Sequence, residues 1–126
     1  MKKAILACIC ICVALGAVAC SSGPQLSDQN VALGKQVILL TDSYLNGEAA
    51  AEEVAPEVEA LAGGAANEPA SNQANQEMFE TALFILSTDI YTASTMDFLG
   101  TDKTEINEKI VEYRDKVAAL VGEPKR

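Results

Sequence analysis

The chain has 126 residues, no histidine, and 18 acidic against 9 basic side chains, which gives a net charge of −9 at pH 7. A field this negative repels nucleic acid, so we expect no nucleic-acid partner. Without histidine, the chain lacks the commonest general base and the commonest neutral metal ligand. The composition therefore argues against an enzyme, and we expect no catalytic residue and no cofactor.

The N-terminal residues have the pattern of a secretory signal. Lys2 and Lys3 are followed by an uncharged apolar stretch, residues 4–18, and by small residues up to Cys20. A basic start, a short apolar run and small residues at the cut site predict a cleaved signal peptide over residues 1–19. An uncleaved membrane anchor is the alternative, although a transmembrane helix needs roughly 20 apolar residues.

The run that ends at Cys20, followed by Ser21-Ser22-Gly23, resembles the lipobox of bacterial lipoproteins, with Ala17 where that family prefers leucine. The resemblance implies that a diacylglycerol is attached to the Cys20 sulfur and that residues 20–27 form a lipidated tether. The three earlier cysteines would leave with the signal peptide, and we interpret them as apolar residues.

The same resemblance implies a location and a membrane contact. We expect the protein on the extracytoplasmic side of the cell envelope, held to the membrane by its lipid anchor. The site would be the outer membrane if the envelope has two membranes, and the outer face of the plasma membrane if it has one.

Two helices are predicted directly after the tether. The first begins at Asp28, and its apolar residues recur at three- and four-residue steps until Asn46-Gly47 ends it. The second covers residues 48–62. Pro56 disturbs this second helix: either the helix begins just before Pro56, where the missing N–H is harmless, or it kinks there.

A loop and two further helices follow. Residues 62–75 are rich in Gly, Ala, Asn and Ser, without apolar rhythm, which indicates a surface loop. The third helix runs over residues 76–99, and its apolar side chains cover so wide an arc that we expect it at the centre of the fold. Thr101 or Asp102 caps a fourth helix. Its narrow apolar seam consists of Ile106, Ile110, Tyr113, Val117 and Leu120.

These elements predict an all-α domain over residues 28–122, an antiparallel bundle of four helices, or of three if the segment around Pro56 is irregular. A short internal sequence repeat suggests two helical hairpins, because Ile38–Tyr44 matches Ile85–Tyr91 at five of seven positions. A duplicated hairpin would place Tyr44 and Tyr91 at equivalent, half-buried positions. Chance similarity is the alternative.

The turn after the first helix is the best candidate for a metal site. Counted from Asp42, the residues Asn46, Glu48 and Glu53 occupy positions five, seven and twelve of a helix–loop–helix calcium loop. Tyr44 stands at position three, where a ligand is needed, so the oxygen shell is incomplete and we expect no metal centre. The structural alternative is that these residues end one helix and begin the next.

Charged and aromatic side chains offer two further surfaces. A cluster of glutamates on the second helix is either a docking face for a basic partner or a solvated helix face, as most charge runs are. Its members are Glu48, Glu52, Glu53, Glu57 and Glu59.

Most aromatic residues fall on positions that we expect to face the core. This leaves no evident aromatic surface on which a sugar could stack. These are Phe79, Phe84, Tyr91 and Tyr113.

A second resemblance covers residues 31–62. Tyr44-Leu45-Asn46-Gly47-Glu48 and the following Ala51-Glu52-Glu53-Val54 are similar to a segment of small, uncharacterised helical proteins and lipoproteins of bacteria. In those proteins a helix ends in Tyr-Leu-Asp-Gly and a shorter helix follows, without the proline found here at position 56. The resemblance implies a helical hairpin and carries no activity.

Two functions from different classes remain. The first is a non-enzymatic interaction module, anchored at the cell envelope, that binds a protein partner by its helical faces. The second is a ligand- or cation-binding lipoprotein that uses the turn at residues 42–53 or the core of the bundle. The first predicts an exposed apolar surface, and the second predicts convergent carboxylates or a cavity.

Overall fold

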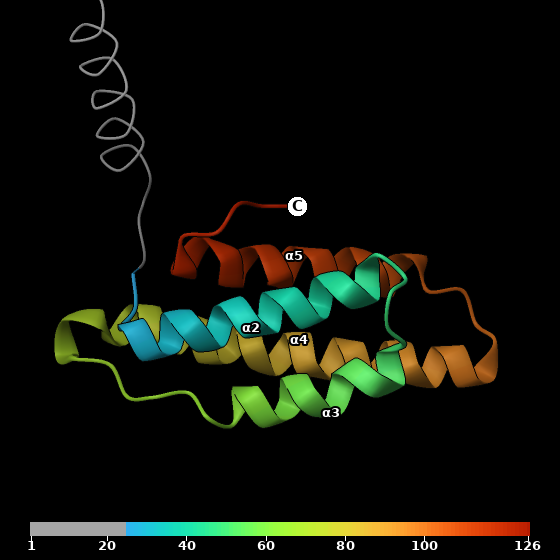
Figure 1. Cartoon of the computed structure of the whole chain (residues 1–126), viewed down its shortest axis with the longest axis horizontal. Coiled ribbons are helices and arrows are strands. Elements are labelled where there is room, and N and C mark those ends of the chain that lie inside the picture. Colours follow the sequence, from blue (N-terminus) through green and yellow to red (C-terminus); the bar gives the residue numbers. More distant parts are fainter. Residues whose placement is uncertain (1–24) are drawn as a thin grey trace, which may run out of the picture.

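A computed structural model describes residues 25–126, and the fold over this range is all-α, as predicted. The predicted signal peptide and the predicted lipidation site, Cys20, lie outside the described residues. Four helices follow one another with alternating direction (Figure 1). They are α2 (Asp28–Leu45), α3 (Ala51–Ala62), α4 (Gln73–Leu99) and α5 (Thr104–Val121), and a single 3-10 turn, η1 (Ala70–Asn72), precedes α4.

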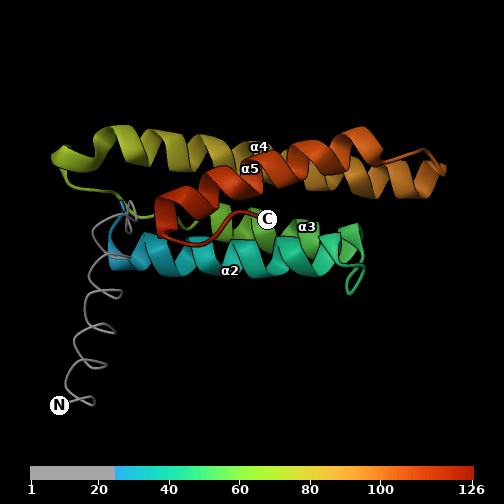
Figure 2. The ribbon, with the colours of Figure 1, turned by 90° about the horizontal axis from the view of Figure 1, so that it is seen from above.

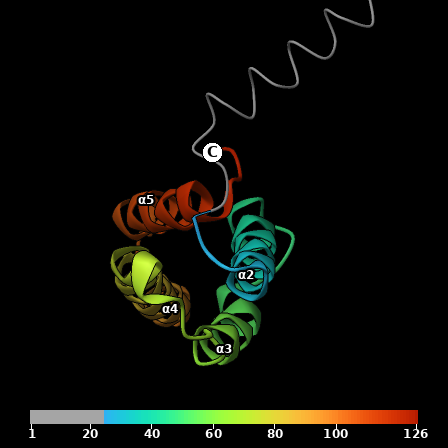
Figure 3. The same cartoon turned by 90° about the vertical axis from the view of Figure 1, so that its left-hand side faces the viewer.

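The four helices form a ring in which each packs against two neighbours. α2 contacts α3 and α5, and α4 contacts the same two helices from the other side. Figure 3 shows this ring end-on, with one helix at each corner. Seen from above, the α2–α3 hairpin and the α4–α5 hairpin lie on opposite sides of the core (Figure 2). The predicted antiparallel helical bundle is therefore confirmed, with four helices rather than three, arranged as two hairpins.

The expectation that the third helix is central was wrong. α4 is the longest helix, but it buries one side, with Phe79, Leu86 and Ile90 in the core. Its other side is open to solvent and carries Phe84 and Tyr91, which were predicted to face the core. The apolar arc is wide because α4 has two apolar stripes, one that faces the core and one that faces solvent. In the sequence pattern the two stripes look like a single wide apolar face.

The two segments of the internal sequence repeat, Ile38–Tyr44 and Ile85–Tyr91, do not occupy equivalent positions in the fold. Tyr44 is buried and its hydroxyl donates to Asn107 Oδ1 at 2.6 Å, whereas Tyr91 is exposed. Leu39 of the first segment is exposed, and the matching Leu86 is fully buried. The two similar segments therefore turn different faces to the core.

Helix ends follow local residues closely. Gly100 and Gly122 end α4 and α5 with φ of 68° and 76°, a left-handed conformation that only glycine adopts cheaply. Asp102 Oδ1 accepts a hydrogen bond from the Thr104 backbone N–H at 3.1 Å, at the start of α5. α3 begins at Ala51 and continues through Pro56, so the first of the two alternatives, a helix that begins just before the proline, does not hold. Pro56 is tolerated on the exposed side of α3, where water can satisfy the carbonyl that loses its donor.

The loop between α3 and α4 is fixed by buried polar side chains. Asn30 Nδ2 donates to the Ala66 carbonyl at 2.8 Å, and Asn30 Oδ1 accepts from the Ala66 N–H at 2.8 Å. Glu68 is buried as well and accepts hydrogen bonds from Asn30 Nδ2 at 2.7 Å and from the Ser27 N–H at 2.8 Å. The carboxylate thereby satisfies an N–H at the start of α2 and ties the loop to that helix.

The N-terminal end of the described chain is held by the opposite hairpin. The Gln25 N–H donates to the Leu120 carbonyl of α5 at 2.9 Å. The Gln25 carbonyl accepts a hydrogen bond from Asn75 Nδ2 of α4 at 3.2 Å. The chain therefore joins the domain beside the C-terminal end of α5 and the N-terminal end of α4.

Gly34→Ala should destabilise the protein. An added Cβ at Gly34 would lie 2.6 Å from Val121 Cγ1 and 3.1 Å from Phe79 Cε2, and the β-branched Val121 has little freedom to move away. Overpacking costs about 1–3 kcal/mol and outweighs the gain of up to about 1 kcal/mol in helix propensity. We expect urea unfolding to show a net loss of about 1–2 kcal/mol. Gly63→Ala is the control, because its Cβ would meet nothing closer than 3.7 Å.

Glu68→Gln should weaken the fold in a pH-dependent way. Burial raises the pKa of Glu68, but the hydrogen bonds from Ser27, Asn30 and Asn72 outweigh it and hold the pKa below its ordinary value of 4.5. A carboxylate with a lowered pKa stabilises the folded state above the unfolded pKa, and that contribution is lost as the pH falls through the folded pKa. Denaturant unfolding at pH 7 should show a loss of about 1–3 kcal/mol, because an amide would face hydrogen-bond donors.

The difference between wild type and Glu68→Gln should shrink as the pH is lowered from 4.5 through the folded pKa. Glu57→Gln, at an exposed position of α3, is the matched control and should stay within about 0.5 kcal/mol of wild type. A difference between wild type and Glu68→Gln that is constant over this range would show that the charge of Glu68 is not what the loop requires.

Candidate functional site

The outward side of α4 carries a regular row of exposed side chains. Phe84, Tyr91 and Phe98 are 71%, 42% and 90% exposed and follow one another at seven-residue spacing. Thr88 and Thr95 stand between them and are also exposed. Steps of four and three residues place all five on one stripe of the helix. We name this stripe, Phe84, Thr88, Tyr91, Thr95 and Phe98, the aromatic seam.

The threonines of the aromatic seam have their hydroxyls satisfied within the helix. Thr88 Oγ1 donates to the Phe84 carbonyl at 2.9 Å, and Thr95 Oγ1 donates to the Tyr91 carbonyl at 3.2 Å. Such bonds to the preceding turn occupy the hydroxyl hydrogen. The seam is therefore less polar than its composition suggests.

A hollow of about 330 Å³ lies beside the aromatic seam, between α3 and α4. The rings of Phe84 and Tyr91 and the carboxylates of Glu59 and Glu80 line it. The Tyr91 hydroxyl donates to Glu59 Oε2 at 2.9 Å, and this hydrogen bond raises the pKa of Tyr91. We name this feature the α3–α4 hollow. It combines two aromatic rings with two acidic groups in one open depression.

A larger groove, of about 520 Å³, lies between α4 and α5. Its walls are mostly apolar and include Met78, Ile85, Tyr113 and Leu120. Lys116 lies at this groove with its ammonium 4.0 Å from the centre of the Tyr113 ring. The groove offers a mostly apolar surface with one basic and one acidic residue, Lys116 and Glu77, in its lining.

Charge is unevenly distributed around the bundle. Every charged residue of α3 and α4 is a carboxylate, and neither helix contains lysine or arginine. The carboxylates are Glu52, Glu53, Glu57, Glu59, Glu77, Glu80, Asp89 and Asp97. Within residues 25–126, Asp97 is the one member of this group with an ion pair, which it makes to Lys103. The aromatic seam thus lies on a half of the surface that is acidic and almost free of ion pairs.

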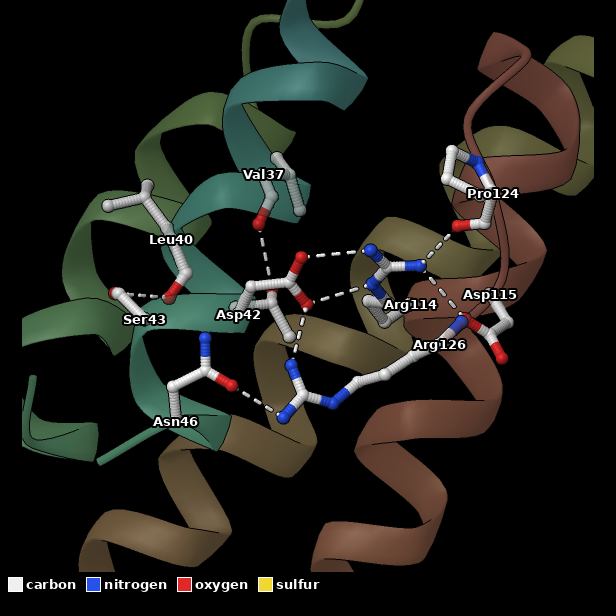
Figure 4. Close-up of polar contacts among 10 residues, drawn as sticks. Val37, Leu40, Asp42, Ser43, Asn46, Arg114, Asp115, Pro124 and Arg126 are labelled. Atoms are coloured by element: carbon white, nitrogen blue, oxygen red, sulfur yellow. Dashed lines mark hydrogen bonds and ion pairs between the residues drawn. The ribbon is translucent and has the colours of Figure 1, made fainter. Parts of the chain in front are cut away.

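Two candidate metal ligands from the sequence, Asp42 and Asn46, instead contact arginines. Asp42 is paired in a bidentate manner with Arg114, with Nε–Oδ1 at 2.9 Å and Nη2–Oδ2 at 2.8 Å (Figure 4). Arg126 Nη2 donates to Asn46 Oδ1 at 2.6 Å, and Arg126 Nη1 lies 3.4 Å from Asp42 Oδ1. The oxygens that a cation would need are already occupied by positive groups.

The other two candidates do not join Asp42. Glu53 Oε2 accepts a hydrogen bond from the Ala50 N–H at 3.2 Å, at the start of α3, and Glu48 is exposed in the turn. No group of three or more acidic or cysteine side chains that could hold a metal ion occurs within residues 25–126. The geometry fits the structural alternative, in which these residues end α2 and begin α3.

Arg114 is the residue of this region that sequence reasoning missed. It is 6% exposed, and its Nη1 also donates to Asp115 Oδ1 at 3.0 Å and to the Pro124 carbonyl at 2.7 Å. It therefore joins α2, α5 and the C-terminal tail. The sequence did indicate that Arg114 is buried. Arg114 lies four residues after Ile110 and three before Val117, which places it on the apolar stripe of its helix.

The aromatic seam was missed for a related reason. The seven-residue spacing of Phe84, Tyr91 and Phe98 is visible in the sequence, but so is the inward stripe that begins with Phe79 and Leu83. Both stripes are apolar and lie on one helix. The pattern alone does not decide which stripe the rest of the bundle covers.

Comparison with protein-family models, with curated proteins and with solved structures finds no match to this chain. Among the described helices, none combines the length and the apolar character needed to cross a membrane. The function proposed below therefore rests on the residues and geometry of this chain.

Arg114→Met should strongly destabilise the protein, because it leaves Asp42 without its bidentate partner. Breaking one side of a buried ion pair costs about 3–5 kcal/mol, and we expect about 2–4 kcal/mol here because Asp42 is 24% exposed. Urea unfolding measures the loss. Adding Asp42→Leu should restore part of it, since both polar groups are then gone. Arg126→Ala, at a more exposed position, should cost about 1 kcal/mol or less; an equal loss for both arginines would contradict a special role for Arg114.

Proposed function

We propose that the protein is a non-enzymatic interaction module, anchored through lipid at Cys20 on the extracytoplasmic side of the cell envelope, and that it binds a protein partner along the aromatic seam. The observation that carries this proposal is the row of exposed rings at Phe84, Tyr91 and Phe98. Soluble surfaces rarely leave contiguous apolar rows uncovered, and heptad spacing suits contact with another helix.

The placement of the seam fits a tethered domain. The described chain begins on the side of the bundle formed by α2 and α5, while α3 and α4 lie on the other side (Figure 3). The chain start also contacts Asn75 at the N-terminal end of α4, and the aromatic seam runs from Phe84 to Phe98 toward the opposite end of that helix. A partner could therefore approach the C-terminal part of the seam at a distance from the point of attachment.

A ligand-binding lipoprotein is the second candidate, and the α4–α5 groove favours it. A groove of about 520 Å³ with mostly apolar walls is large enough for a small amphiphilic molecule. The groove is open to solvent, and the charged residues that line it are Lys116 and Glu77. Phe84 and Phe98 do not line it, so a variant of the aromatic seam would leave this second function intact.

The anchor is tested by mass spectrometry of the protein from its native membrane fraction. The wild-type chain should begin at Cys20 and carry lipid there, and Cys20→Ala should lose both the lipid and the membrane association. An intact, unlipidated wild-type chain would overturn the proposed anchor and leave the seam to be tested on its own.

The docking surface is tested by a photoreactive amino acid placed at position 84 in the full chain in cells. Phe84 is 71% exposed, and Leu39 on α2 is 70% exposed, so a probe at position 39 is a matched control. We expect a defined cross-linked product from position 84 and none from position 39. Additional Tyr91→Ser and Phe98→Ser changes should reduce the yield several-fold, since aromatic anchors dominate such contacts. Equal products from both positions would contradict the proposal.

A further inference from the structure

The aromatic seam has the length of a helical contact. It spans fifteen residues from Phe84 to Phe98, and the fourteen steps between its ends cover about 21 Å at a rise of about 1.5 Å per residue. A partner helix of four turns would cover it. Side chains on the flanks of that helix would then face the surfaces on either side of the seam.

The α3 flank of the seam is acidic and lacks counter-charges. Glu59 accepts a hydrogen bond from the Tyr91 hydroxyl, and Glu80 accepts one from Gln76 Nε2 at 3.0 Å. Neither is ion-paired with a lysine or arginine in the described part of the chain. Charge complementarity across an interface therefore calls for positive groups on the partner.

A second copy of this chain does not satisfy that requirement. A symmetric dimer through the aromatic seam would bring α3 and α4 of one copy against the same helices of the other. Because both helices carry carboxylates and no basic residue, the contact would place like charges together. Such repulsion costs free energy and selects against self-association.

The α3–α4 hollow has the chemistry to receive one long basic side chain. A guanidinium pairs with carboxylates such as Glu59 and Glu80 and also stacks on aromatic faces such as Phe84 and Tyr91. The alkyl stem of the same side chain would lie along the apolar wall. The hollow thus joins the apolar contact of the seam to a contact that selects charge.

We propose that the partner's docking segment is a basic amphipathic helix, with an apolar stripe against the aromatic seam and an arginine or lysine in the α3–α4 hollow. This inference rests on the proposed function and adds the chemical class of the partner. It commits to a partner helix with positive flanks, which differs from both a second copy of the chain and an acidic or neutral helix.

The test uses two synthetic helical peptides of about 21 residues, enough to cover the seam. They share a leucine stripe, and one carries arginine and lysine on its flanks where the other carries glutamate. Binding to the full chain in neutral-lipid nanodiscs is measured by fluorescence anisotropy. The protein variants are Phe84→Ser and the pair Glu59→Gln with Glu80→Gln. Leu39→Ser and Glu108→Gln are matched controls at exposed positions of α2 and α5.

We expect the basic peptide to bind at least about tenfold more tightly than the acidic one. Phe84→Ser and the Glu59/Glu80 pair should each weaken it by about tenfold, while the controls leave it unchanged. Raising the salt concentration from about 50 mM to about 300 mM should weaken binding, because it screens the flanking charges.

Other outcomes separate this inference from the proposed function. If the two peptides bind equally, or neither binds while position 84 still cross-links a partner in cells, the basic helix is wrong and the interaction module stands. A cross-link between two copies of the chain would replace the basic helix by self-association. If neither peptide binds and position 84 cross-links nothing, both proposals fail.

Discussion

The contact between α2 and α5 is the one on which the rest of the structure depends. The other three neighbouring pairs in the ring are joined by short connections, so each can form as a local hairpin. α2 and α5 are far apart in sequence, and only their contact closes the ring and covers the core. Two features secure it: Gly34 lets the helices approach closely, and the Arg114–Asp42 pair fixes their register through a bidentate geometry. The aromatic seam is presented outward only because this closure fixes which side of α4 faces in.

Much of the fold could be predicted from local sequence, because helix ends depend on local residues. Gly100 and Gly122 end helices by their own backbone freedom, and the apolar steps of α5 mark its buried stripe. What could not be predicted depends on distant parts of the chain. Asn30 is buried because the loop at Ala66 lies over it. The residues near position 30 do not predict this contact. The orientation of α4 is a similar case, since two apolar stripes compete for the core and the neighbouring helices decide between them.

The candidate site likewise has features that local sequence predicts and features that depend on distant residues. Asp42 and Asn46 sit in a turn whose spacing resembles a cation loop, but their partners come from residues 114 and 126, far along the chain. The Asp42 carboxylate is paired with arginine and contributes to the fold, whereas the carboxylates of α3 make no ion pair within residues 25–126. The ion pairs with arginine thus lie in the α2–α5 half of the bundle, and the carboxylates of α3 lie outside them. Basic residues on α2, α5 and the tail help to hold the molecule together, and the acidic half is the part that we propose for partner binding.

The attachment of the first described residues has a mechanical consequence. Tension applied at Gln25 does not act on α2 alone, because its carbonyl and N–H are bonded to α4 and α5, and Ser27 is bonded to Glu68 in the loop after α3. A load along the chain is thus shared by several elements in parallel before the first turn of α2 can be peeled away. Hydrogen bonds that are loaded together resist force better than bonds loaded one after another. A domain held by its N-terminal end would keep the packing of its four helices intact while its attachment point is pulled.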